Sequence, residues 1–196
     1  MNLLRRVGRR LAALVLLLPL ALALVVHADV RAAIPVADFG RFDSFPASVA
    51  GYARGDVMAY APHLADFSIA YDSRSFSLQN AVTLFFYPHR HDDPAAQLAD
   101  EEQQVLRAHE GARVVGRRDV TLSHGAASRE ATLVSFEFDG DFAGSRQPLA
   151  SQLLLVFRGR NVFMVRSTAP QSQGALAERA MLELVQRVDW ESVPDR

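Results

Sequence analysis

The chain has 196 residues, no cysteine and no lysine, and its 21 arginines nearly balance its 22 acidic residues, for a formal charge of −1. The absence of cysteine excludes disulfides, thiolate metal sites and the lipid anchor that bacterial lipoproteins carry on a cysteine. The length fits one domain with a substantial core.

Residues 1–28 have the order of a secretory signal peptide. Several arginines precede an apolar run over residues 11–26, and the small residues that signal peptidase prefers end at Ala28. This order predicts a periplasmic or secreted protein, cleaved after Ala28 or after Ala32. The alternative is an uncleaved N-terminal membrane anchor, although the run is shorter than the roughly 20 residues of a membrane-spanning helix.

Removal of residues 1–28 takes away four arginines and no acid, so the formal charge becomes −5. A mildly acidic domain is a poor match for nucleic acid or for anionic lipid, both of which attract basic surfaces. Contact with a membrane is therefore expected only if the N-terminal segment stays uncleaved. Residues 29–48 contain two prolines and no regular spacing of apolar residues, which predicts a linker. Residues 49–196 are expected to form a single domain.

Short stretches of alternating or β-branched residues predict about six strands in this domain. Asp139-Gly140 and Gly159-Arg160 are typical turn sequences between neighbouring strands. Residues 49–60 are a candidate for an additional, earlier strand. The six expected strands cover residues 67–71, 81–87, 114–122, 131–138, 152–157 and 162–168.

Two helices accompany the strands. Asp93 is a good N-cap before a proline, and this helix is expected to run to about His109, just before Gly111. Its apolar stripe is thin, and its acidic residues 100–102 are expected to face water. The second helix, over residues 172–188, repeats apolar residues at helical spacing. Strands in runs, separated by helices, predict an α+β fold with an antiparallel sheet of about six strands covered by two helices.

Two stretches resemble motifs of the PsbP-like fold, which occurs in photosystem accessory proteins and in many small exported bacterial proteins. One expected strand ends in Tyr87-Pro88 and precedes a helix rich in Glu and Gln, and the strand over 162–170 carries Arg166 and ends in proline. The resemblance covers most of residues 45–190. The family consists mostly of assembly factors and chaperone-like adaptors and has no shared catalytic residues, so the resemblance implies a non-catalytic role without a cofactor.

One loop carries the residue types of a metal site. His89, His91 and Asp92 lie close together directly after a strand, and imidazole and carboxylate groups are ligands that zinc accepts. The alternative is a polar loop whose Asp93 caps the following helix. With a metal bound, the chain would be a small envelope hydrolase that uses the His89–Asp93 loop.

Three arginines flank the last expected hairpin. Arg158, Arg160 and Arg166 could form a site for an anion, because guanidinium groups bind carboxylate or phosphate through two parallel hydrogen bonds. The alternative is ordinary cross-strand pairing with the acidic residues Glu130, Glu137 or Asp139. Arg166 shares a strand face with apolar residues, so it would need a partner if that face is covered.

The favoured function is therefore an exported, non-enzymatic accessory or binding domain, which acts in the cell envelope on a protein partner or a small ligand. We expect no catalytic residues and no cofactor for this function. The two hypotheses differ in one structural feature. An enzyme should bring ionisable groups together in one cleft, whereas a binding domain should present a groove or patch to its ligand.

Overall fold

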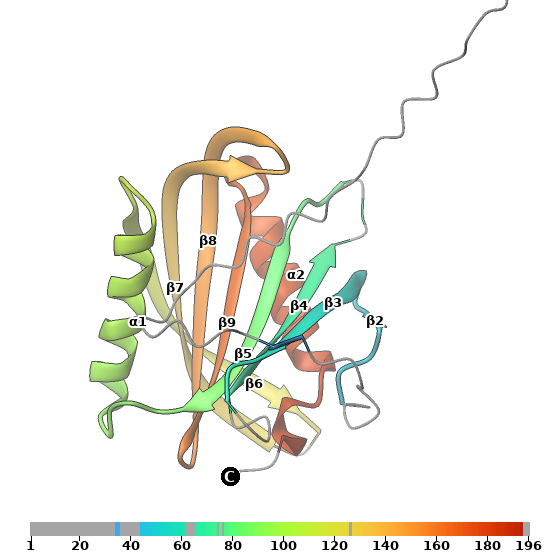
Figure 1. Ribbon diagram of the computed structural model, residues 1–196, viewed down its shortest axis with the longest axis vertical. Coiled ribbons are helices and arrows are strands. Elements are labelled where there is room, and N and C mark those ends of the chain that lie inside the picture. Colours follow the sequence, from blue (N-terminus) through green and yellow to red (C-terminus); the bar gives the residue numbers. More distant parts are fainter. Residues whose placement is uncertain are drawn as a thin grey trace, which may run out of the picture.

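The computed structural model describes residues 34–35, 44–61, 66–73, 75, 77–125 and 127–193. They form one antiparallel sheet in the order β1-β3-β4-β5-β9-β8-β7-β6, with β2 paired to β3 (Figure 1). The predicted export segment and its cleavage sites lie outside these residues. Among the residues described, no helix is both long enough and apolar enough to span a membrane.

The helices of the domain are short 3-10 turns or regular α-helices. They are α1 (Pro94–Ala108), η2 (Gln171–Gln173), α2 (Gly174–Arg187) and η3 (Trp190–Ser192). The strands are β1 (Ile34–Pro35), β2 (Ser48–Val49), β3 (Tyr52–Ala59), β4 (Phe67–Ser73), β5 (Ala81–Pro88), β6 (Arg113–His124), β7 (Ala127–Phe142), β8 (Ser145–Arg158) and β9 (Asn161–Pro170).

The predicted α+β class with an antiparallel sheet and two helices is confirmed, but the strand count of about six is too low. All six expected strands are present, and the candidate strand within residues 49–60 is β3. The additional strands β1 and β2 have two residues each, which is too short for an alternation of apolar and polar residues to be recognised in the sequence. In β3 a register shift between Arg54 and Val57 interrupts the alternation that marks a strand in sequence.

The turn predicted at Asp139-Gly140 is wrong. Strand β7 continues through these residues, which pair with Pro148 and Gln147 of β8, and the hairpin closes further along, at Ala143-Gly144. Both closing residues have a positive φ, 51° and 82°, as a tight hairpin turn requires. Gly140 has another role, because a Cβ at this position would lie 3.0 Å from the Leu149 side chain.

Parts of the expected linker over residues 29–48 belong to the fold. Phe45 is fully buried in the main core and packs edge-on against Phe86, with ring centroids 5.4 Å apart. Ile34 and Pro35 pair with the end of β3. The apolar surface that Phe45 buries explains why this segment joins the domain, although its apolar residues have no regular spacing in the sequence. The other residues of the expected linker before Ser44 lie outside the described part.

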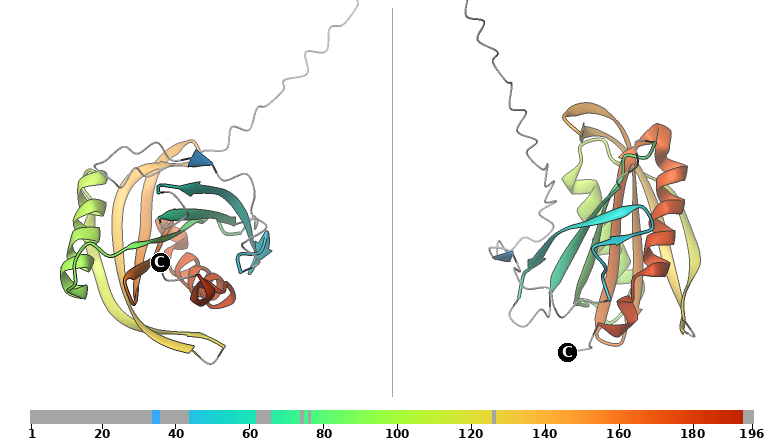
Figure 2. Two further views of the ribbon diagram at one scale, coloured as in Figure 1. Left: turned by 60° about the horizontal axis from the view of Figure 1, so that its bottom comes forward. Right: turned by 90° about the vertical axis from the view of Figure 1, so that its right-hand side faces the viewer.

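The sheet is curved, and its two faces are covered by different helices. Helix α2 lies on the concave face and α1 on the convex face (Figures 1 and 2). Alternate residues of β9 show the same division, because Phe163 and Val165 join the core beneath α2, whereas Val162 and Met164 join the core beneath α1. The central strands are therefore buried on both faces, which explains their nearly continuous apolar sequence.

The concave face holds the larger of the two cores. Met181 and Leu184 of α2 are fully buried against the sheet. After the helix, Trp190 stacks on Phe163 with ring centroids 5.0 Å apart, and its indole nitrogen donates to the carbonyl of Val185 at 3.1 Å. The chain end is thus part of the core rather than an appendage.

The packing of α2 leads to a first prediction. Leu184→Ala is expected to lower the free energy of unfolding by about 2–5 kcal/mol, because a buried side chain is lost and a cavity remains. Leu176→Ala is the matched control on the same helix, since Leu176 is 41% exposed, and it should change stability by less than about 0.5 kcal/mol. Urea unfolding measures both variants. Two equally small effects would show that α2 does not pack on the sheet.

Candidate functional site

The inner side of α1 is polar, which the sequence did not indicate. Glu101 and Glu102 were expected to face water, but they are buried, with exposed fractions of 2% and 7%. Helix α1 offers the convex face only a thin apolar stripe, so carboxylates fill the remaining contact. A buried carboxylate is costly unless it is paired, and both of these are paired.

Glu101 is held by three donors at one oxygen. Its Oε1 accepts hydrogen bonds from the Tyr87 hydroxyl at 2.7 Å, Arg90 Nη2 at 2.7 Å and Gln97 Nε2 at 2.8 Å. Burial, followed by the charge of Glu101, raises the pKa of Tyr87 far above its usual range, so this hydroxyl keeps its proton. The Glu101 charge is compensated directly by Arg90, which also contacts Asp100 at 3.0 Å.

Glu102 connects α1 to the edge of the sheet. Its two oxygens accept from Nε and Nη2 of Arg117 on β6, at 2.8 and 2.6 Å. This two-point geometry is the strongest form of an arginine–carboxylate pair. Together, Glu101 and Glu102 hold the helix in place over the convex face.

Arg166 is different, because its guanidinium group has unsatisfied atoms. The residue lies on the convex face of β9 and is 8% exposed. Its Nε and Nη1 atoms are buried and have no hydrogen-bond partner among the described residues. Burial lowers the pKa of Arg166 to about 10, with Glu101 and Tyr87 acting in the opposite direction. The group therefore stays protonated at neutral pH.

His109, the C-cap residue of α1, has a buried ring nitrogen without a partner among the described residues. Its ring stacks on Phe138 at a centroid distance of 3.9 Å, and its Nε2 has no partner in the part of the chain that the structure describes. Burial and then the charge of Arg166 lower the pKa of His109, so the imidazole is neutral at neutral pH. Arg166 interacts electrostatically with both Glu101 and His109.

The strand neighbours of Arg166 are buried to different extents on its two sides. Leu153, its neighbour on β8, is fully buried under α1. On the other side, Arg166 pairs with Thr83 of β5, and Thr83 pairs with Ala70 of β4. Both of these residues are half-buried. The positions on the β5 side of Arg166 are thus less buried than its neighbour on β8.

A polar pocket of about 280 Å³ lies beyond the stacked His109 and Phe138 rings. Phe138 lines it together with Arg113, Glu137 and Asp139. Arg113 forms an ion pair with Glu137, which leaves Asp139 as the charge of this pocket that has no ion pair among the described residues. An anion is therefore disfavoured in this pocket.

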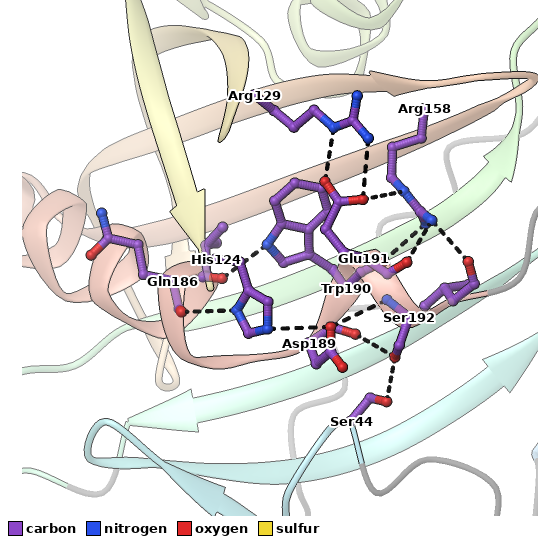
Figure 3. A network of polar contacts seen from close by, with 11 residues as sticks. Ser44, His124, Arg129, Arg158, Gln186, Asp189, Trp190, Glu191 and Ser192 are labelled. Carbon is purple, nitrogen blue, oxygen red and sulfur yellow. Dashed lines mark hydrogen bonds and ion pairs between the residues drawn. The ribbon is translucent and has the colours of Figure 1, made fainter. Parts of the chain in front are cut away.

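The structure does not bring the three predicted arginines together. Arg158 points to the concave face, where its guanidinium donates to the carbonyl oxygens of Trp190, Glu191 and Val193 at 3.0, 2.8 and 2.9 Å (Figure 3). Among the described residues, Arg158 pairs with none of the acidic residues expected on the hairpin, and its Nε lies 3.4 Å from a Glu191 carboxylate oxygen. Arg158 therefore anchors the end of the chain.

Further contacts complete this anchor. Arg129 of β7 binds the Glu191 carboxylate at 2.9 Å, and His124 contacts both the Gln186 carbonyl at 3.3 Å and the Asp189 carboxylate at 3.2 Å (Figure 3). Most of these partners lie more than 30 residues apart in sequence, so no local pattern could indicate them.

Arg160 lies in the exposed two-residue turn between β8 and β9. Its backbone oxygen accepts from the His89 nitrogen at 3.0 Å, and the residue is exposed, whereas Arg158 is buried on the concave face. Arg166 is thus the member of the predicted anion set that has buried nitrogen atoms without a partner among the described residues.

The predicted metal ligands do not converge. His89 Nδ1 lies 3.8 Å from Asp92 Oδ1, whereas His91 Nε2 lies 3.8 Å from Asp100 Oδ2. No group of three or more His, Asp or Glu side chains that could hold a metal ion occurs in the described part of the chain. Asp93 acts as the helix cap that was expected as the alternative, since its Oδ1 accepts from the Ala95 nitrogen at 3.0 Å.

Comparison with known proteins gives the fold but no function. No protein-family model and no curated protein matches the chain. Among solved structures, it is similar to PA94 from Pseudomonas aeruginosa, a protein of unknown function, with a TM-score of 0.50 and 14% identity over 72% of this chain and 92% of that chain. This similarity shows a shared fold alone. The chain is also similar to LpqN, a protein involved in cell envelope biogenesis of Mycobacterium tuberculosis, with 15% identity over 81% of this chain and 84% of that chain. The TM-score of this second match is 0.40, which is too low to support an argument.

Sequence reasoning singled out Arg166 but missed Glu101 and His109. One signal was available. A helix that must cover a sheet but has a thin apolar stripe has to place polar residues inward, and basic residues before and after it, Arg90 and Arg117, are suitable partners. The PsbP-like resemblance is not confirmed by the comparisons and stays a prediction.

The role of Arg158 leads to a second prediction. Arg158→Met is expected to lower the free energy of unfolding by about 3 kcal/mol, because one buried and two partly buried carbonyl groups, and the Glu191 carboxylate, lose their donor. The single tryptophan of the chain, Trp190, should then show red-shifted fluorescence as the chain end detaches. Arg160→Met, in the exposed turn of the same hairpin, is the control and should leave both signals unchanged. Equal behaviour of the two variants would contradict the anchoring role.

Proposed function

We propose that this chain is an exported binding domain of the cell envelope, and that an anionic group of its ligand or partner binds at Arg166. One observation carries the proposal: a buried guanidinium group, 8% exposed, whose Nε and Nη1 have no partner among the described residues. Folded proteins satisfy nearly all buried polar groups, and exceptions call for an explanation. A ligand that supplies the missing acceptor is such an explanation.

The chemistry of the convex face supports binding rather than catalysis. The titratable groups closest to Arg166 are committed to each other, because Glu101 Oε1 takes three donors and Tyr87 holds its proton. What remains is an excess of donors. An excess of fixed donors recognises an anion, whereas acid–base catalysis needs a group that is free to exchange a proton. A non-catalytic role is also what the resemblance to PsbP-like proteins implies.

Export is the second part of the proposal, and its support is the order of residues 1–28. N-terminal sequencing of the protein from an envelope or culture fraction is expected to begin at Asp29 or Ala33. An intact Met1 in the membrane fraction would indicate an anchored protein instead. A product found in the cytoplasm alone would contradict export in either form.

The binding role of Arg166 is tested by comparing stability with function. Arg166→Met should leave the free energy of unfolding unchanged or raise it by up to about 4 kcal/mol, because a buried charge without a partner is replaced by an apolar side chain of similar length. The same variant should fail to restore the phenotype of a deletion strain. Residues kept for function commonly cost stability in this way.

Arg158→Met is the matched comparison, because this buried arginine lies on the same hairpin and has all its partners in the domain. It should lose stability, in contrast to Arg166→Met. If Arg166→Met loses several kcal/mol as well, Arg166 is structural and the proposed site is wrong. Full complementation by a stable Arg166→Met protein would also overturn the proposal.

A further inference from the structure

Independently of the ligand proposed at Arg166, we infer that α1 is a detachable cover, which opens the convex face while the sheet and α2 stay folded. The two helices are attached to the sheet in different ways. The buried residues of α1 are mostly polar: Gln97, Glu101 and Glu102, beside the apolar Val105. The buried residues of α2 are all apolar: Ala177, Met181, Leu184 and Val185. Burial of apolar surface therefore holds α2 in place, whereas α1 depends mainly on polar contacts.

Two groups of ion pairs attach α1 to the rest of the domain. Before the helix, Arg90 Nη2 lies 3.0 Å from Asp100 Oδ2 and 2.7 Å from Glu101 Oε1. At the edge of the sheet, Arg117 donates to the two oxygens of Glu102 at 2.8 and 2.6 Å. The side chains of Arg90 and Arg117 are 39% and 55% exposed, so water and salt ions compete for both attachments.

The course of the chain keeps a detached α1 close to the sheet. The helix follows β5 and precedes β6, and β7, β8 and β9 lie between these two strands in the sheet. Residues 89–93 and 109–112 connect it to the strands, so it is tethered at both ends. Gly111, in the second connection, has a φ of 74°, which glycine adopts without strain. Opening also separates the stacked rings of His109 and Phe138.

Opening of α1 uncovers an apolar surface. Val105 packs in one cluster with buried residues of the central strands, among them Val134, Phe136 and Leu153. The residues that pack against α2 form a separate cluster on the opposite face of the sheet. Loss of α1 therefore leaves the concave core covered and exposes the convex one, and exposed apolar surfaces of this kind serve as binding sites.

The test uses thiol reporters, because the chain has no cysteine. Val134→Cys places a thiol in the convex core, and Val165→Cys places one in the concave core; both valines are fully buried. The same substitution in the two cores gives a matched pair. The rate of labelling by a soluble disulfide reagent is measured under native conditions on the full mature protein. It is expected to be at least about 100-fold higher for Val134→Cys, because detachment of α1 requires less free energy than global unfolding.

Two adjacent arginines of β6 provide a second matched pair. Arg117 binds Glu102 of α1, whereas Arg118 binds Glu178 of α2 at 2.8 Å. In the Val134→Cys protein, Glu102→Gln should raise the labelling rate roughly 10-fold, since a charge-assisted hydrogen bond is weakened. Glu178→Gln should leave this rate unchanged, because α2 does not cover the convex core. Sodium chloride at about 1 M should also raise the rate, since it screens the exposed ion pairs.

Two results of the labelling experiments would overturn the inference. Equal rates for Val134→Cys and Val165→Cys would mean that α1 leaves the sheet only when the whole domain unfolds. Equal acceleration by Glu102→Gln and Glu178→Gln would show a general loss of stability rather than release of α1.

Hydrogen exchange of the wild-type chain provides a measurement without introduced cysteines. The backbone amides of α1 are expected to exchange at least about 100-fold faster than those of α2, since local opening exposes the first helix alone. Equal protection of the two helices would contradict the role of α1 as a detachable cover.

Discussion

The central strands β8 and β9 are buried on both faces, and this constraint shapes the rest of the molecule. Nearly every residue of their central parts is shielded from water. Such strands need a cover on each side, which α2 and α1 provide, and each polar group that they carry inward needs a partner. On the concave face this demand is met within the domain. On the convex face it is met for the carboxylates of α1, whereas Nε and Nη1 of Arg166 have no partner among the described residues.

The two buried arginines of the β8–β9 hairpin show how one residue type takes opposite roles. Arg158 faces the concave side, where the chain end supplies carbonyl oxygens and a carboxylate, so its charge stabilises the fold. Arg166 faces the convex side, where the nearest carboxylate is already occupied by Arg90. The difference comes from the alternation of side chains along a strand, which point in turn to one face of the sheet and then to the other. The position of each arginine in its strand therefore decides which face it occupies.

The polar underside of α1 holds this helix against the convex face. Glu101 and Glu102 attach the helix through Tyr87, Arg90 and Arg117, so the helix does not depend on a wide apolar stripe. Under the function proposed above, Arg166 is already held in place by the fold, and binding of an anion would cost little reorganisation.

What the sequence by itself determined is local: the strand and helix segments, the cap at Asp93, the hairpin at Gly159-Arg160 and the export order of residues 1–28 can all be recognised within short stretches. It also identified Arg166 as a residue that would need a partner. The tertiary structure alone decided the rest: the role of Phe45 in the core, the late turn at Ala143-Gly144, the inward carboxylates of α1 and the different surroundings of Arg158 and Arg166. Secondary structure follows from neighbouring residues and their period, whereas the partner of a buried charge depends on which distant segment the fold brings onto the same face of the sheet.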